Sequence, residues 1–139
     1  MINSRSIDDL TLDAQAWFKR FVMKVEDEAG MIYGHDWIVT STYRDQECQD
    51  KLFAQGRSDP GPVVTWTRYS RHTGRRAWDI AIRDNKTGKL SWDIKVDVNH
   101  DNMPDYQQLA LLGKSMGLNC GYFWAKRDAA HFELPETVG

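Results

Sequence analysis

The amino-acid sequence predicts an α+β fold in which helices flank a mostly antiparallel sheet. Segments with helical periodicity and segments with strand-like composition occur in separate groups, instead of alternating as strand–helix–strand units. Two strand-like segments are joined by a short polar turn, which favours a hairpin. A chain of 139 residues with 41% hydrophobic residues can bury a core of ordinary size. We therefore expect residues 1–139 to form a single small domain.

The N-terminal third is predicted to contain a helix followed by a strand. Apolar residues recur at helical spacing from residue 6 to about residue 28, and Ser6 or Asp8 is available to cap this helix. Residues 35–44 are rich in β-branched and aromatic side chains, which is typical of a strand. We therefore expect a core-facing helix ahead of the first strand.

A second helix, a loop and a hairpin are predicted next. Asp45 can cap a helix that ends before residues 56–65, whose prolines and glycines predict a surface loop. Residues 77–84 alternate as a strand does, and residues 85–89 form a turn into a strand at 90–94. The last third then holds a helix at 104–116, bounded by a proline and a glycine, and two short strands at 118–124 and 130–134.

The polar loop before the third helix begins like a calcium-binding loop. Asp97, Asn99 and Asp101 alternate as the first ligands of an EF-hand do. Neither the glycine nor the distal glutamate of an EF-hand follows at the expected offset. The sequence alone therefore favours a solvated loop.

Charge and composition argue against several classes of protein. A net charge of −2 does not favour binding to nucleic acid or anionic lipid. The first twenty residues carry acids where a signal peptide needs a basic segment, and no later apolar run is long enough to cross a bilayer. Cys48 and Cys120 match no metal-binding spacing, so we expect two reduced thiols. We expect a monomer that is not inserted in a membrane and that stays in the cytoplasm of the producing cell until it is released.

Two histidines and an aspartate stand where packing does not readily explain them. His72 lies in a charged loop, Asp79 interrupts an apolar strand, and His131 begins the last strand. A carboxylate at Asp79 is costly to bury unless it is paired or bound to a metal. Two imidazoles and one carboxylate suit zinc and leave one coordination position open for water.

Asp128 stands three residues before His131, in the sequence DAAH. A carboxylate there can take a proton from a water that attacks a carbonyl. Each of these residues alone also has an ordinary structural explanation, and no HExxH, HxxEH or cysteine-rich pattern accompanies them. The residues that flank them strengthen the case for a shared site.

The flanking blocks resemble, in order, those of a family of zinc peptidases. The family includes D-alanyl-D-alanine carboxypeptidases and the L-alanyl-D-glutamate endopeptidases of phage endolysins, and the likeness runs from about residue 37 to residue 134. Its signature is S-x-H-x-x-G-x-A-x-D, followed further along by an acid, two residues and a histidine. The matching blocks are STYR, CQDKLFAQGR, VVTW, SRHTGRRAWDI, GYFW and DAAHFEL, in which Ser70, His72, Ala77, Asp79, Asp128 and His131 fit the signature.

The resemblance implies a role for each matching residue. His72, Asp79 and His131 are implied as zinc ligands and Asp128 as the general base. Arg44 matches an arginine that contacts substrate and stabilises the developing oxyanion. Substrate contacts are expected from Arg44, Ser70 and Trp124, and the aromatic candidates for a substrate groove are Trp66, Tyr69, Trp78, Tyr122 and Trp124.

One position departs from the family pattern. The family glycine falls three residues after the histidine, where this chain has Arg75, and Gly74 comes one residue early. If that position requires a positive φ, Arg75 is strained or the loop is bent differently.

The resemblance implies a zinc-dependent L-alanyl-D-glutamate endopeptidase that hydrolyses bacterial peptidoglycan, in the phage or prophage endolysin branch. The alternatives are a D-alanyl-D-alanine carboxypeptidase or dipeptidase on the same scaffold, a non-catalytic zinc-containing wall-binding module, and a lysozyme-like glycosidase. Asp128 and Arg44 argue against the binding module, because neither is needed to hold zinc. Because imidazole must be neutral to bind zinc, we expect the affinity to weaken below about pH 6.

Overall fold

The computed structural model describes residues 1–67 and 70–136, and its elements match the predicted α+β class. The helices are α1 (Leu12–Ala29), α2 (Gln46–Ala54) and α3 (Asp105–Ser115), with 3₁₀ turns η1 (Ile7–Asp9) and η2 (Gly121–Phe123). The strands are β1 (Trp37–Ser41), β2 (Ala77–Arg83), β3 (Leu90–Ser91), β4 (Asn119–Cys120) and β5 (His131–Glu133). No helix in the described part of the chain combines the length and the apolar character needed to span a bilayer.

The strands form an antiparallel sheet in the order β1-β2-β5-β4, with β3 paired to β2. Successive side chains of a strand point to opposite faces, so Trp78 and Ile80 are buried in the core while Asp79 faces the other side. The strand register places Asp79 opposite both His131 on β5 and Ser41 on β1. Three polar side chains therefore form a row across the sheet.

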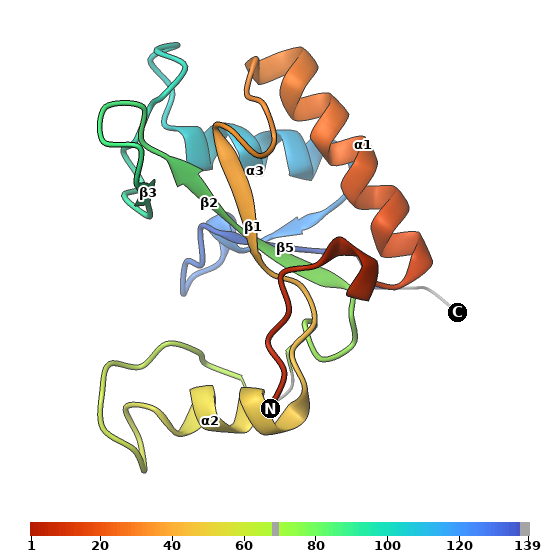
Figure 1. The fold of residues 1–139 in the computed structure, drawn as a ribbon, viewed down its shortest axis with the longest axis vertical. Helices are drawn as coiled ribbons and strands as arrows, with labels where there is room; N and C mark the ends of the chain where they lie inside the picture. The colour runs from red at the N-terminus through yellow and green to blue at the C-terminus, as the bar shows by residue number, and fades with distance from the viewer. Residues whose placement is uncertain (68–69, 137–139) are drawn as a thin grey trace.

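Helices α1 and α3 pack against the apolar face of the sheet (Figure 1). Phe18 and Phe21 of α1 contact the ring of Trp78, with ring centroids 5.3 Å and 5.9 Å away. Tyr106 of α3 donates its hydroxyl to the carbonyl of Ser91 at 2.6 Å. Helix α2 and the loop that follows it lie apart from these two helices (Figure 1). The polar row is thus left on the face that α1 and α3 do not cover.

Several predicted element boundaries are wrong, among them the end of the strand predicted at 90–94, which stops at Ser91. Ser6 caps η1, and α1 begins only after Thr11, whose hydroxyl accepts from the backbone N–H of Ala14. Buried Leu10 takes an extended conformation between η1 and α1, which prevents one continuous helix. The strand predicted at 118–124 ends at Cys120 and becomes η2. The cap by Asp45 and the hairpin of β2 with β3 are confirmed.

Candidate active site

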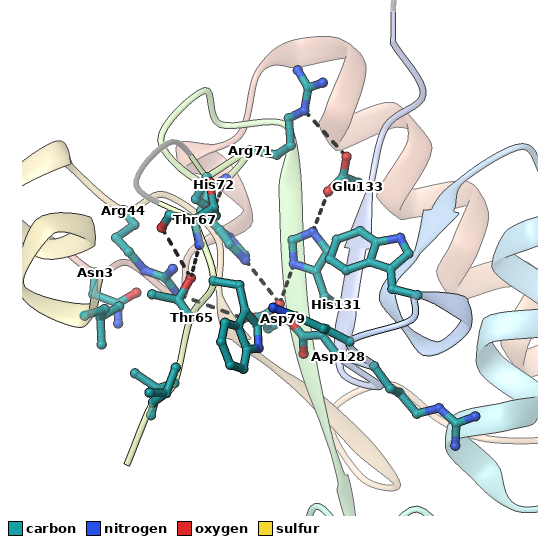
Figure 2. A pocket seen from close by; sticks show the side chains of 18 residues that line it. Asn3, Arg44, Thr65, Thr67, Arg71, His72, Asp79, Asp128, His131 and Glu133 are labelled. Carbon is teal, nitrogen blue, oxygen red and sulfur yellow. Dashed lines mark hydrogen bonds and ion pairs between the residues drawn. The ribbon is translucent and has the colours of Figure 1, made fainter. Parts of the chain in front are cut away.

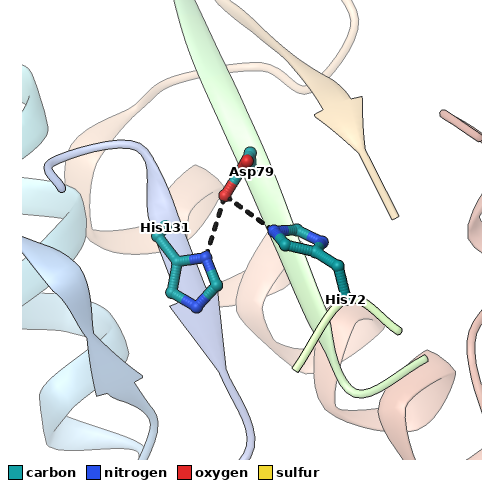
Figure 3. Close-up of side chains that lie close together, drawn as sticks. All are labelled: His72, Asp79 and His131. Atoms are coloured by element: carbon teal, nitrogen blue, oxygen red, sulfur yellow. Dashed lines mark hydrogen bonds and ion pairs between the residues drawn. The ribbon is translucent and has the colours of Figure 1, made fainter. Parts of the chain in front are cut away.

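His72, Asp79 and His131 come from three segments and meet on the polar face of the sheet (Figure 3). His72 lies in the loop before β2, Asp79 in β2 and His131 in β5. Asp79 Oδ1 lies 3.1 Å from His72 Nε2 and 3.0 Å from His131 Nδ1. One ligand atom from each residue fits within a group whose members are all within 4.8 Å of one another. The predicted ligands are therefore brought together.

The second ring nitrogen of each histidine is held by an oxygen acceptor. His72 Nδ1 lies 2.9 Å from the carbonyl oxygen of Thr42, and His131 Nε2 lies 2.8 Å from Glu133 Oε1. A hydrogen on each of these nitrogens would leave the nitrogen that faces Asp79 free to bind a metal, as second contacts of metal-ligating histidines commonly do.

His72 Nε2 supplies a direct test of whether the group suits a metal. The nitrogen is buried and close to Asp79, but the contact lacks hydrogen-bond geometry, so the described residues offer this atom no hydrogen-bond partner. A buried polar atom without a partner is unusual in a folded protein. Two imidazole nitrogens and a carboxylate oxygen are also ligands that zinc accepts. The donor set fits a divalent metal ion.

Close packing shifts the pKa values of Asp79 and His131. Burial opposes the charge of Asp79, but His72 and His131 outweigh it and hold the pKa of that carboxyl well below its usual range. Burial also disfavours the His131 imidazolium, but the hydrogen bonds that it donates to Asp79 and Glu133 outweigh this effect and raise the pKa of His131 to about 10. A metal ion that binds His131 must displace this proton.

Asp128 lies next to Asp79 (Figure 2), on the loop that leads into β5. Its backbone N–H donates to the carbonyl of Gly121 at 2.9 Å, and its carbonyl accepts from His131 N–H at 3.1 Å. Partial dehydration, followed by repulsion from Asp79, raises the pKa of Asp128, although the residue as a whole is exposed. A carboxylate with a raised pKa is better suited to taking and returning a proton near neutral pH.

Arg44 is held beside the group by polar contacts on several sides. Its Nη1 donates to Gln49 Oε1 at 2.8 Å, and its Nη2 donates to Ser41 Oγ at 3.4 Å. Nη2 also lies 4.0 Å from Asp79 Oδ2. Gln49 is fully buried and donates its own amide to the carbonyl of Thr67 at 2.6 Å. The guanidinium is therefore fixed before any substrate arrives.

A cavity of about 770 Å³ contains the group and includes the predicted substrate contacts Arg44, Ser70 and Trp124 in its lining. The centroids of the Trp124 and His131 rings lie 5.1 Å apart. The Ser70 hydroxyl accepts from the backbone N–H of His72 at 3.1 Å, so it also positions that loop.

The other aromatic candidates divide between the cavity and the core. Trp66 lines the cavity and is 61% exposed. Trp78 is fully buried against Phe132, so its assignment to the groove is wrong. Tyr122 packs against the core under Arg127, and Tyr69 lies outside the described residues.

In the loop between His72 and β2, the position at which the family signature has glycine does have a positive φ. Arg75 has a φ of +61°, a region that side-chain-bearing residues rarely adopt, whereas Gly74 does not have a positive φ. The chain therefore makes a left-handed turn at residue 75 without glycine. The Arg75 guanidinium lies over the Tyr43 ring, 3.9 Å from its centroid.

Sequence reasoning missed three contributors to the site. Glu133 holds His131, the Thr42 carbonyl faces His72, and Gln49 fixes Arg44. Glu133 could have been predicted from the sequence. It lies two residues after His131 on the same strand, and residues two apart on a strand share a face. The other two depend on how separate segments pack, which no local pattern reveals.

Known proteins resemble this chain in sequence and in fold. A peptidase M15 family described as D-alanyl-D-alanine carboxypeptidase matches residues 64–134. The peptidoglycan L-alanyl-D-glutamate endopeptidase CwlK of Bacillus subtilis (strain 168) is 32% identical over 104 residues, which are 73% of this chain and 62% of that protein. The chain thus spans less than two thirds of the length of this relative. The crystal structure of the Serratia marcescens L-Ala D-Glu endopeptidase ChiX shares the fold, with a TM-score of 0.59, 19% identity, and coverage of 96% of this chain and 89% of that one.

Proposed function

Because the chain belongs to the M15 peptidase family described as D-alanyl-D-alanine carboxypeptidase, we propose that it is a zinc-dependent peptidase that cleaves the L-alanyl-D-glutamate bond of peptidoglycan stem peptides. The observation that carries the proposal is the meeting of His72, Asp79 and His131 in one open cavity with Asp128 and Arg44. The choice of bond is supported by the name of the B. subtilis relative.

The proposed reaction assigns a distinct task to each side chain. His72, Asp79 and His131 would hold zinc, which when bound supplies a Lewis acid that polarises a carbonyl and makes water easier to deprotonate. The Asp128 carboxylate accepts a proton from the attacking water and returns it to the leaving amine. The Arg44 guanidinium donates hydrogen bonds to the carbonyl oxygen as negative charge develops there.

Charges in the cavity suit an acidic peptide. Lys126 and Arg127 line the cavity in addition to Arg44, and the Lys126 ammonium lies 3.7 Å from the centre of the Trp66 ring. A stem peptide carries carboxylates that such cations attract. Exposed Trp66 and Trp124 offer flat apolar surfaces beside these charges.

The biological setting belongs to the same proposal. We place the protein in phage or prophage lysis, as a monomer that is kept in the cytoplasm of the producing cell and acts on the wall after release. The support is the resemblance of its ordered sequence blocks to the endolysin branch. Native mass spectrometry of the purified protein checks the monomer, and lysis after co-expression with a membrane-permeabilising protein checks the route of release.

The decisive experiment is mass spectrometry of muropeptides after digestion of purified cell wall. We expect new peptides that begin with D-glutamate. Asp128→Ala should keep its zinc content and far-UV circular dichroism but lose about 10²–10⁴-fold in kcat, the usual contribution of a general base. Asp27→Ala, which removes an exposed carboxylate on α1, is the matched control and should retain full activity.

Two outcomes would contradict the proposal. Release of free D-alanine without new D-glutamate termini would identify the carboxypeptidase alternative. A zinc-loaded parent that releases no amine from the wall would identify a binding module.

A further inference from the structure

The segment from the end of β3 to the first residue of α3 concentrates acidic side chains that the proposed reaction does not use. Asp97, Asp101 and Asp105 belong to it, and none of them lines the 770 Å³ cavity. The described lysine and arginine side chains form their ion pairs with carboxylates outside this segment. Among the described residues, therefore, no ion pair with a lysine or an arginine balances the negative charge of these three carboxylates.

Asp105 is fully buried, and one of its carboxylate oxygens has no partner. Oδ2 accepts from the backbone N–H of Val98 at 2.7 Å, which turns the carboxylate into the loop. Oδ1 is buried and receives no hydrogen bond from the described residues. Burial raises the pKa of Asp105 to about 6 despite the hydrogen bond from Val98, which lowers it, and repulsion from Asp97, Asp101 and Asp36 adds to the rise. Such a group is costly to bury without a positive charge beside it.

Asn99 presents a second oxygen of the same kind. Its amide nitrogen donates to the carbonyl of Ala29 at 2.9 Å, to Gln108 Oε1 at 3.1 Å and to Asp101 Oδ2 at 3.3 Å, which determines how the amide is turned. The Asn99 Oδ1 atom is buried and has no donor among the described residues. Two buried oxygens that lack donors thus belong to one short loop.

These residues have the offsets of a calcium loop. Counted from Asp97, the first, third, fifth and ninth positions are Asp97, Asn99, Asp101 and Asp105, which are the side-chain ligand positions of an EF-hand loop. The sixth position, normally glycine, is Asn102, and its φ of +66° gives the turn that glycine usually supplies. The absence of glycine, which weakened the sequence argument, is thus compensated in the backbone.

We propose that this loop binds one calcium ion through Asp97, Asn99, Asp101 and Asp105, with the carbonyl of Met103 at the seventh position. All of these donors are oxygens, which Ca²⁺ prefers and Zn²⁺ does not. The twelfth position is Gln108, so the bidentate glutamate of a tight EF-hand is missing. We expect a Kd of about 10⁻⁵–10⁻³ M, in the range of sensor and extracellular sites. The ion would link the loop to the first turn of α3.

The test uses the full chain, freed of calcium with a chelator and reloaded with one equivalent of zinc. Calorimetric titration with CaCl₂ should show one saturable site, and calcium should raise Tm by roughly 5 °C or more at saturation. MgCl₂ should bind more weakly, because Mg²⁺ demands a tighter octahedral shell and gives up water reluctantly.

Two loop variants and one control make the test specific. Asp101→Asn changes an exposed residue, so the fold should survive while the calcium affinity falls by about tenfold or more. Asp105→Asn removes the buried charge and should lose the thermal response to calcium. Asp27→Asn changes the net charge equally on α1 and should bind calcium as the parent does.

The inference would be overturned by a parent protein whose Tm and titration heat do not respond to millimolar calcium. Equal affinity in Asp101→Asn would also overturn it, since the loop would then not hold the ion. Calcium binding that is lost in His72→Ala but kept in Asp101→Asn would place the ion in the peptidase site instead.

Discussion

At the scale of single residues, the candidate site is organised by the contacts behind its ligands. The Thr42 carbonyl and the Glu133 carboxylate hold the outer nitrogens of His72 and His131, so both rings present a defined nitrogen to Asp79. Glu133 is itself buried, and its Oε2 lies 3.5 Å from Arg71 Nε. Ring orientation is therefore specified by the protein before a metal binds.

Arg44 tests whether a fixed guanidinium is needed for the reaction. Arg44→Lys keeps the charge but replaces two directed N–H groups, to Gln49 and Ser41, with a single ammonium. We expect kcat/KM on peptidoglycan fragments to fall by about 10²-fold or more, as loss of one oxyanion donor does in other hydrolases. The far-UV circular dichroism and zinc content should match the parent. A lysine variant with nearly full turnover would reduce Arg44 to a structural residue.

Arg75 tests the strain in the loop that carries His72. Arg75→Gly and Arg75→Ala both lose the contact with Tyr43, but only glycine relieves the φ of +61°. The glycine variant should therefore be more stable than the alanine variant by about 1 kcal/mol, measured by urea denaturation. The same pair made at Gly74, where φ is not positive, should favour alanine or show little difference. An alanine variant at residue 75 that equals the glycine variant would show that the turn carries no strain.

At the scale of elements, the site depends on where short segments end. Strand β4 stops at Cys120 because η2 brings Gly121 against the loop that carries Asp128. A Cβ on Gly121 would clash with the Asp128 carbonyl oxygen and lie 3.1 Å from the His131 Cβ. This close approach requires glycine and places the proposed base beside a proposed ligand.

Gly121→Ala should therefore displace Asp128 and His131 together. We expect this single methyl group to lower zinc affinity and activity. It would clash with a backbone carbonyl, which cannot move aside as a flexible side chain could. Gly74→Ala is the matched control, since its Cβ would meet only the Arg71 carbonyl at 3.6 Å, an ordinary contact. Zinc titration and peptidoglycan turnover of the two variants provide the comparison. Parent-like behaviour of Gly121→Ala would mean that the η2 contact is not needed.

Local patterns predicted the elements well where they depend on local physics. The Asp45 cap, the β2–β3 hairpin and the breaks around α3 follow from capping, turn chemistry and proline, which act over a few residues. The start of α1 and the end of β4 were mispredicted because burial of Leu10 and the approach of Gly121 to Asp128 are tertiary effects. The ligand set was suggested by two histidines and an aspartate that packing does not readily explain, and the family resemblance strengthened it, since residues 72, 79 and 131 match no standard metal-binding spacing.

At the scale of the whole molecule, the candidate metal group connects parts of the chain that are distant in sequence. His72 precedes β2 and His131 begins β5, and the intervening residues include β3, α3 and β4. A metal bound to both histidines would therefore tie the two central strands and the His72 loop together. A ligand that binds only the folded chain stabilises it in proportion to the logarithm of its concentration over Kd.

Zinc removal should consequently lower Tm, and the loss should grow as pH rises. The pKa of His131 is raised from 6.5 to about 10, so its proton stabilises the metal-free fold fully below pH 6.5 and this stabilisation is lost as pH rises toward about 10. Zinc replaces the same proton, so zinc affinity should increase over that whole range. With a free imidazole, the increase would end at about pH 6. Scanning calorimetry of zinc-loaded and zinc-free protein between about pH 6 and pH 9 should show a widening difference in Tm. Glu133→Gln removes one of the three carboxylates, Asp79, Glu133 and Asp128, that raise the His131 pKa, so in this variant the pH at which the difference levels off should fall. A difference that stays constant with pH in both proteins would show that zinc does not compete with a proton on His131.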